Sequence, residues 1–403
     1  MKRQLFFTAI AGLFTTMASA ADLIVRDGGA DGAFSTISAA ISQASDGDRI
    51  IIRPKVGNLP YQENILVNKS LTFVSEIQGD QYEINGSFTI QTMENRTVTI
   101  HDANIVNGND LLLSGTFTGD RMTVNVMNCA VADEIKLDTP GVTANIYGST
   151  AVYINMVHGK AIANQSRRIY VLDDTYPMPA ESDIYLIANK VIFPATGSYV
   201  GSTVSISSSQ YTFHVYNNFI QNSLGGPAIA VPTAKTGATN DIMNNFVYAN
   251  ISPNGNIVNL GATQVCTINV LNNAFDAGNY QYLVVASAAP YVVVQYNVMD
   301  SSSSNQFQLN GVDVGTNNTN GNYGLTSDGV VTGTVLTNAG NPDGSYADLD
   351  LSINDVGVHG GSYAWANYWT GQTAKPHVFF LDTPRRVFNG TTAIFASGEA
   401  VTK

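Results

Sequence analysis

Short runs of alternating apolar and polar residues recur along most of the chain. In residues 213–216, Phe213 and Val215 alternate with polar neighbours, as expected of a β-strand with one buried face. Many of these runs end in asparagine, and between residues 211 and 300 the asparagines return after 27, 28 and about 25 residues, at Asn217-Asn218, Asn244-Asn245, Asn272-Asn273 and Asn297. A near-constant period of this size predicts a solenoid whose repeating unit is one coil of strands and turns.

Asparagine suits the bend of such a coil for a physical reason. It tolerates the left-handed backbone conformation of a sharp turn, and its amide both donates and accepts hydrogen bonds. Asparagines stacked in successive coils are therefore expected to bond to the coils above and below. The alternative interpretation treats them as turn formers of an ordinary all-β protein, but the repeated spacing favours the solenoid.

The chain before and after this region fits the same architecture. Residues 35–45 have a helical pattern, with Ile37, Ala40, Ile41 and Ala44 on one face, and this helix is expected to cover the open apolar end of the first coil. Strand patterns at similar spacing then predict roughly eleven coils. We divide the chain into residues 1–20 (signal peptide), 21–48 (first strand and cap helix), 49–325 (solenoid) and 326–403 (closing coils and cap).

The first coils resemble a known family. The helix, Gly47-Asp48, an apolar strand, Tyr61-Gln62-Glu63-Asn64-Ile65 and Lys69-Ser70-Leu71-Thr72-Phe73 follow in the order seen at the start of right-handed parallel β-helix proteins of the pectin-lyase-like superfamily. The resemblance implies a three-sheet coil, a helical N-terminal cap and frequent binding of acidic polysaccharides. The fold class we predict is therefore an all-β, right-handed parallel β-helix with an amphipathic cap helix and a C-terminal β cap.

The C-terminal part is also similar to the end of many secreted bacterial β-helix proteins. The similarity lies in the alternating run from Asp348 to Gly357. Trp365, Tyr368, Trp369 and a strand around residues 378–381 are expected to cap the far end of the solenoid.

The first 20 residues have the order of a secretory signal peptide. Lys2 and Arg3 precede an apolar run over residues 5–17, and small residues at 18–20 provide a cleavage site. We predict cleavage between Ala20 and Ala21, which gives a secreted extracellular or periplasmic protein. No later stretch of about 20 apolar residues exists, so no transmembrane segment is expected.

The net charge excludes some classes of binding partner, and the spacing of the two cysteines excludes a disulfide. The formal net charge is −12, and removal of Lys2 and Arg3 makes it −14. An acidic surface repels nucleic acid and anionic lipid, so neither is an expected partner. Cys129 and Cys266 would lie about 26 Å apart along the solenoid, which is too far for a disulfide, and both are expected to be buried thiols.

The basic residues indicate where catalysis would lie if the protein is an enzyme. A polyuronate lyase needs an arginine or lysine base and further cations beside the substrate carboxylate. Lys235 is the only lysine or arginine between Lys190 and Lys375, so that half of the chain lacks the cations that a lyase needs. The candidate groove therefore covers the coils of residues 120–175, where basic and acidic residues are more frequent. The catalytic motifs of polygalacturonases, pectin methylesterases and alginate epimerases are not matched. The candidate catalytic residues are Lys160, Arg168, Asp173 and Asp174.

Within that set, Asp173 and Asp174 are a possible acid and base of an inverting hydrolase, provided that they lie in a loop. The alternative for all four residues is an ordinary role as solvated surface charges.

Calcium is the one candidate cofactor. Asp348, Asp350, Ser352 and Asn354 alternate like the first positions of a calcium loop. Ile353 stands where such a loop needs glycine, and no bidentate glutamate follows. The alternative is a hydrogen-bonded turn that closes the last coil.

Two functions remain open. The first is a secreted or cell-surface solenoid that binds extracellular polysaccharide or surfaces without catalysis, because its long faces of Ser, Thr and Asn offer few catalytic groups. The second is a polysaccharide-degrading enzyme, a polyuronate lyase or glycoside hydrolase, acting over residues 120–175. A lyase requires Lys160 or Arg168 within reach of a substrate. Ice binding would need threonines at the coil period, which the sequence lacks.

Overall fold

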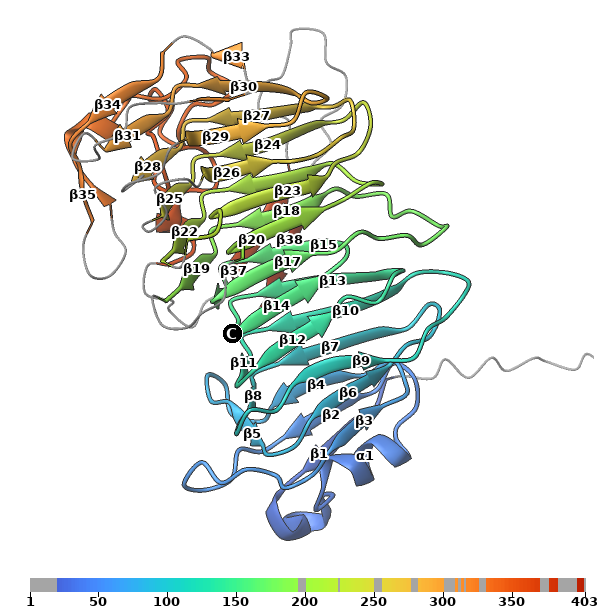
Figure 1. Ribbon diagram of the computed structural model, residues 1–403. Helices are drawn as coiled ribbons and strands as arrows, with labels where there is room; N and C mark the ends of the chain where they lie inside the picture. The colour runs from blue at the N-terminus through green and yellow to red at the C-terminus, as the bar shows by residue number, and fades with distance from the viewer. Residues whose placement is uncertain are drawn as a thin grey trace, which may run out of the picture.

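The chain folds into a parallel β-solenoid of about 11 coils (Figure 1). The computed structural model describes residues 20–194, 201–223, 225–249, 256–276, 282–300, 309–310, 313–314, 317–325, 331–369, 377–382 and 397–401. Residues 1–19, which carry nearly all of the predicted signal peptide, lie outside this set.

Each coil contributes strands to three parallel sheets. We number the sheets 1, 2 and 3 in the order in which the chain passes through them within one coil. In the described residues, sheet 1 consists of β1 (Asp22–Val25), β2 (Arg49–Ile52), β4 (Thr72–Ser75), β7 (Thr97–His101), β10 (Met122–Met127), β13 (Val142–Tyr147), β15 (Gly159–Ile162), β18 (Ile184–Ile187), β21 (Phe213–Tyr216), β24 (Thr239–Met243), β27 (Thr267–Leu271), β30 (Tyr291–Gln295) and β33 (Asp313–Val314).

Sheet 2 has two parts and sheet 3 is continuous. The parts of sheet 2 are β5 (Tyr82–Ile84), β8 (Ala103–Ile105) and β11 (Ala130–Val131), then β16 (Gln165–Ser166), β19 (Lys190–Phe193), β22 (Phe219–Asn222), β25 (Phe246–Ala249), β28 (Ala274–Asp276), β31 (Val298–Asp300) and β34 (Thr319–Gly321). Sheet 3 consists of β3 (Ile65–Val67), β6 (Phe88–Gln91), β9 (Leu111–Ser114), β12 (Glu134–Leu137), β14 (Tyr153–Met156), β17 (Arg168–Val171), β20 (Val204–Ser207), β23 (Ile229–Thr233), β26 (Asn256–Leu260), β29 (Tyr282–Ala286) and β32 (Leu309–Asn310).

A few elements lie outside these sheets. They are the helix α1 (Ile37–Gln43), the 3₁₀ helices η1 (Asp27–Gly32), η2 (Thr334–Leu336) and η3 (Trp365–Asn367), and the antiparallel pairs β35 (Gly324–Leu325) with β36 (Val331–Thr332) and β37 (His377–Asp382) with β38 (Ser397–Val401).

The alternation in the sequence sets which side chains fill the interior. In sheet 1, Val126 of β10 lies in register between Ile100 of β7 and Ile146 of β13, and all three are fully buried. Asn125 points outward, where its amide donates a hydrogen bond to the Thr99 hydroxyl at 3.0 Å. Each coil thus adds one aliphatic layer to a continuous core, because its neighbours remove that layer from water.

Helix α1 is held at both ends by side chains from the first coil. It begins after Thr36, whose hydroxyl accepts the N–H of Ala39 at 3.2 Å. The Glu63 carboxylate accepts the N–H groups of Ile37 and Ser38 at 2.8 and 2.9 Å. At the other end, the Lys69 ammonium donates to the carbonyls of residues 41, 42 and 44. Both charges complement the helix dipole and satisfy its unpaired terminal groups.

A ladder of buried asparagines marks the bend from sheet 1 to sheet 2. Asn245 Oδ1 accepts the backbone and side-chain N–H groups of Asn218 at 2.9 and 3.0 Å, and its Nδ2 donates to the Val215 carbonyl at 2.9 Å. The same pattern links Asn164, Asn189, Asn218, Asn245, Asn273, Asn297 and Asn318 from coil to coil. The predicted hydrogen bonding between coils is therefore confirmed.

The two asparagines of each pair have different structural roles. The first takes the left-handed conformation, with φ of 54° at Asn217, 55° at Asn244 and 56° at Asn272, and the second forms the ladder. In the earlier coils Ala163 and Ala188 take that left-handed position instead. These coils therefore have Ala-Asn where later coils have Asn-Asn. A search for repeated Asn-Asn pairs does not find the ladder residues Asn164 and Asn189.

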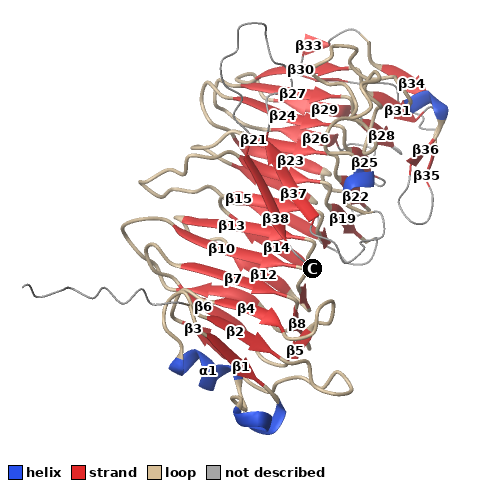
Figure 2. Cartoon of the chain, turned by 180° about the vertical axis from the view of Figure 1, so that it is seen from behind, coloured by secondary structure: helices blue, strands red, loops and turns tan. Residues whose placement is uncertain are grey.

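The C-terminal residues run back along the flank of the solenoid. This corrects the prediction that Trp365, Tyr368, Trp369 and the strand around 378–381 cap its far end. Figure 2 shows β37 and β38 against the side of the rod, far from its last coil. We call residues 336–369 together with β37 the C-terminal strap.

The strap follows the left-handed residues of the bend from coil to coil. The N–H of Asn341 donates to Asn272 Oδ1 at 2.9 Å, and Asn244 Nδ2 donates to Asn354 Oδ1 at 2.8 Å. Further along, the indole of Trp365 donates to the Asn217 carbonyl and that of Trp369 to the Ala188 carbonyl. The left-handed residues thus hold the strap through their outward-directed side chains and through their backbone carbonyls.

Replacement of Glu63 by alanine is expected to lower the free energy of unfolding by about 2 kcal/mol, because helix α1 loses the charged acceptor of two backbone N–H groups. Urea unfolding of the mature chain measures this change. Glu94, which is exposed on the solenoid, is the matched control, and Glu94→Ala should be near neutral. Equal effects of the two substitutions would contradict the assigned role of Glu63.

Replacement of Asn245 by alanine is expected to cost roughly 3 kcal/mol, because buried backbone groups in two coils lose their partners. Hydrogen exchange should show faster exchange of the N–H of Asn218 and its neighbours, while the first coils stay protected. Asn259→Ala, on the outer face of β26 (Asn256–Leu260), is the control. Unchanged protection around Asn218 would show that the ladder does not hold the coils together.

Candidate functional site

The two cations predicted as catalytic do not meet. Lys160 lies on β15 of sheet 1, and its Nζ is 4.8 Å from the centre of the Phe380 ring in the strap. Arg168 lies on β17 of sheet 3, is only 5% exposed, and places its guanidinium carbon 4.1 Å from the ring centre of Phe193. Because they belong to different sheets and both pack against aromatic rings, the structure does not place them in one groove.

The two predicted carboxylates lie in the loop between β17 and β18 and have different surroundings. Asp173 lines an open groove, where one of its oxygens accepts the N–H of Ser209 at 2.7 Å. Asp174 is 1% exposed and lies in the protein interior. An acid and base pair must both contact the substrate. The structure thus brings only Asp173 to a surface that a ligand can reach.

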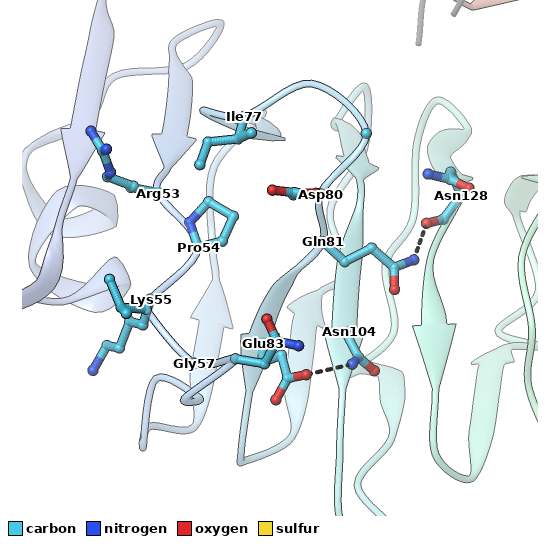
Figure 3. A pocket seen from close by; sticks show the side chains of 13 residues that line it. Arg53, Pro54, Lys55, Gly57, Ile77, Asp80, Gln81, Glu83, Asn104 and Asn128 are labelled. Atoms are coloured by element: carbon cyan, nitrogen blue, oxygen red, sulfur yellow. Dashed lines mark hydrogen bonds between the residues drawn. The ribbon is translucent and has the colours of Figure 1, made fainter. Parts of the chain in front are cut away.

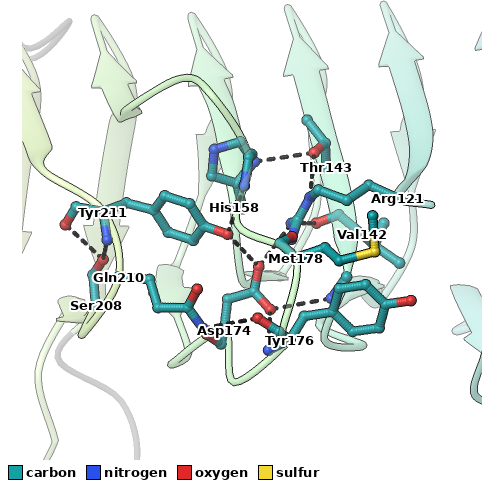
Figure 4. Close-up of polar contacts among 12 residues, drawn as sticks. Arg121, Val142, Thr143, His158, Asp174, Tyr176, Met178, Ser208, Gln210 and Tyr211 are labelled. Atoms are coloured by element: carbon teal, nitrogen blue, oxygen red, sulfur yellow. Dashed lines mark hydrogen bonds and ion pairs between the residues drawn. The ribbon is translucent and has the colours of Figure 1, made fainter. Parts of the chain in front are cut away.

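Asp174 is the centre of a buried polar cluster (Figure 4). One carboxylate oxygen accepts from Arg121 Nη2 at 2.7 Å and from the Tyr211 hydroxyl at 3.0 Å. The other accepts the N–H groups of Gly141 and Tyr176, both at 3.1 Å. A buried charge is tolerated when it is paired and fully hydrogen-bonded, as here. The cluster anchors the β17–β18 loop to the coils before and after it.

His158 belongs to the same cluster and is completely buried. Its Nδ1 lies 3.0 Å from the Thr143 hydroxyl and its Nε2 lies 2.9 Å from the Ser182 carbonyl. Burial lowers the pKa of His158 to about 4, so the ring is neutral at physiological pH. The neutral ring donates from Nε2 to the carbonyl and accepts at Nδ1 from Thr143. With both nitrogens engaged, His158 has a structural role in this arrangement.

A second histidine, His214, lies on the outer face of sheet 1 between two aspartates. Its ring nitrogens are 3.3 Å from Asp183 and 3.1 Å from Asp241. Burial alone would lower the pKa of His214, but the hydrogen bonds and charges of the two carboxylates outweigh it and raise the pKa to about 9. The Tyr185 ring stacks on His214 and contacts Phe380, so this ion cluster lies beside the strap.

An open groove lies over the outer face of sheet 3, and we call it the tyrosine groove. It has a volume of about 410 Å³. Tyr170 of β17 and Ser205 of β20 are paired in register on its floor. Asp173 and Leu172, which is 43% exposed, lie along one side. The groove combines an aromatic ring, hydroxyl groups and one carboxylate on a rigid sheet. Its full lining is Tyr170, Val171, Leu172, Asp173, Gly201, Ser202, Ser205, Ser207 and Thr233.

A second and larger groove, the amide groove, lies over the first part of sheet 2 (Figure 3). Its volume is about 650 Å³, and the loops of residues 53–58 and 76–81 flank it. Glu83 of β5 accepts from the amide of Asn104 on β8 at 3.1 Å. Gln81 donates to the backbone carbonyl of Asn128 at 2.6 Å. This site was not predicted from the sequence, because the prediction relied on clustered basic residues, which lie in later coils.

The predicted calcium ligands are engaged in hydrogen bonds within the strap. Asp348 accepts the N–H groups of Asp355 and Gly361, and Asp350 accepts the N–H and hydroxyl of Ser352. Asn354 is a buried residue of the strap, where it accepts from Asn244 Nδ2 and donates to the Tyr346 carbonyl. Among the described residues, no three His, Cys, Asp or Glu side chains are placed to hold a metal ion. These contacts are those of the hydrogen-bonded turn, the alternative given above, and calcium binding by the four residues stays a prediction.

Both cysteines are buried free thiols, as expected from their spacing. Burial raises the pKa of the Cys129 thiol to about 12 and also raises that of Cys266. A thiol reacts as the thiolate, so neither cysteine has the character of a nucleophile.

The fold defines the class of the protein as a parallel β-solenoid. No family model matches the chain, and the comparisons with curated proteins and with solved structures gave no match. The relation to the pectin-lyase-like superfamily therefore stays a resemblance of sequence motifs. Within the described residues, no helix has the length and apolar character needed to cross a membrane.

The His214 cluster predicts a pH dependence of stability. A pKa raised from 6.5 to about 9 gives stabilisation that is complete below pH 6.5 and lost as the pH rises through 9. The whole effect corresponds to about 3 kcal/mol. Thermal unfolding at a series of pH values should show a steeper loss of stability in this range for the wild type than for His214→Gln. Parallel pH profiles would contradict the assigned charge of His214.

Proposed function

We propose that the mature chain is a secreted, non-catalytic solenoid that binds extracellular polysaccharide in the tyrosine groove. The observation that carries the proposal is the position of Tyr170 on the floor of a hydroxyl-lined groove. An aromatic ring packs against the apolar face of a sugar ring, while hydroxyls and a carboxylate bond to the sugar hydroxyls. Secretion follows from the predicted signal peptide, with cleavage between Ala20 and Ala21.

The lining of the groove favours an uncharged sugar. Its only ionisable groups are the Tyr170 phenol and the Asp173 carboxylate, and it contains no lysine or arginine among the described residues. An anionic sugar would be repelled by Asp173 and by the acidic chain, whose formal net charge is −12 with Lys2 and Arg3 included. A lyase would need cations at this place, and the hydrolase alternative would need a second carboxylate. Both requirements weigh against the enzyme hypothesis.

The first test is retention of the mature chain on a panel of immobilised neutral polysaccharides. Tyr170→Ala is expected to weaken binding about tenfold, because the sugar loses its aromatic platform. Tyr291→Ala is the matched control, since Tyr291 is 57% exposed on β30 of sheet 1, away from the groove. If the two variants bind as the wild type does, the tyrosine groove is not the binding site.

An activity assay distinguishes the enzyme alternative. The mature chain is incubated with the same polysaccharides and with polygalacturonate, alginate and chondroitin, with and without calcium. We expect neither new reducing ends nor the ultraviolet absorbance of unsaturated ends. Product formation that is lost in Asp173→Asn would replace the binding proposal with a catalytic one.

A further inference from the structure

The amide groove has a chemical character different from that of the tyrosine groove. Asp80 and Glu83 contribute two carboxylates to its lining, and Gln81, Asn104 and Asn128 contribute amides. Pro54 and Ile77 give it an apolar wall (Figure 3). Oxygen acceptors therefore lie beside a surface on which a carbon skeleton can pack.

The carboxylates of this groove are not neutralised by the cations at its margin. Lys55 is paired with Asp27 at 3.1 Å, and Arg53 lies 3.8 Å from Glu76. In Figure 3 both basic side chains point away from Glu83 and Asn104. Among the described residues, neither Asp80 nor Glu83 has a salt-bridge partner. The inner part of the groove is thus negative, on a protein that is itself acidic.

We propose that the amide groove is a second binding site, which takes a glycan carrying free amino groups. A protonated amine has three N–H donors and no acceptor, which matches a carboxylate with neighbouring amide oxygens, and the groove offers one carboxylate at Asp80 and another at Glu83. The ring carbons of the sugar pack on Pro54 and Ile77. N-acetylation of the amine removes its charge, so the site discriminates against the acetylated sugar.

The floor of the groove favours a glycan over a basic peptide. Glu83 on β5, Asn104 on β8 and Asn128, which comes just before β11, belong to three successive coils, which gives a length of about 10 Å, roughly that of a disaccharide. The floor is the face of a sheet whose backbone groups bond to neighbouring strands. An extended peptide binds best where a free strand edge offers backbone partners, and this face has none to offer.

The test measures binding of two glucosamine oligomers of equal length by titration calorimetry at mildly acidic pH, one unacetylated and the other fully N-acetylated. The wild type is expected to bind the unacetylated oligomer roughly tenfold more tightly. Glu83→Gln and Asp80→Asn should each remove most of this preference. Glu94→Gln, the same change at an exposed site in the turn between β6 and β7, should not.

Three outcomes would overturn the proposal. They are equal binding of the two oligomers, equal effects of Glu83→Gln and Glu94→Gln, and equally tight binding of an oligolysine peptide of the same charge. Tyr170→Ala separates this site from the tyrosine groove. It should leave binding of the unacetylated oligomer unchanged, and loss of binding in this variant alone would assign the ligand to the tyrosine groove.

Discussion

The buried asparagine ladder is the constraint on which the rest of the structure depends. Each rung satisfies the backbone of one coil with the amide of the next, so the backbone groups of the bend between sheets 1 and 2 find partners in the interior. A one-residue left-handed turn must precede each rung to turn the next amide inward. The side chain of that turn residue then faces outward, and Asn217, Asn244 and Asn272 use it to bind the strap.

The same requirement explains why the charged residues of the middle coils are poor catalytic candidates. A loop that departs from the solenoid between β17 and β18 must be fixed to it, and Asp174 does so through Arg121, Tyr211 and two backbone N–H groups. Once these groups satisfy one another in the interior, they are removed from any substrate. The polar side chains that line the tyrosine groove in this region are Tyr170, Asp173 and a set of hydroxyls, which suit binding better than proton transfer.

The two grooves lie on different sheets and differ in charge. The rigid parallel sheets hold the outward-facing side chains of each groove floor at the spacing of the strands, and loops add Asp80 to the amide groove and Asp173 to the tyrosine groove. A rod with separate sites for two sugars would bind a mixed polysaccharide more tightly than either site alone, provided that one chain can span both. The strap covers the flank between sheets 1 and 2 and leaves both grooves open.

The sequence by itself determined the elements and the class of fold. Alternation, the period of the asparagines and the apolar face of residues 37–44 are local or regular patterns, and each appears in the structure where it was expected. Outside the asparagine ladder, only the tertiary structure decided which polar residues meet. Asp174 and Arg121 are 53 residues apart, and Trp369 bonds to a carbonyl 181 residues away. Loops of different length change the number of residues between neighbouring coils, so spacing in the sequence does not give the contacts between them. No periodic pattern in the sequence indicates where the strap binds. Whether a charged residue is buried or exposed therefore depends on tertiary packing, which the sequence pattern does not show.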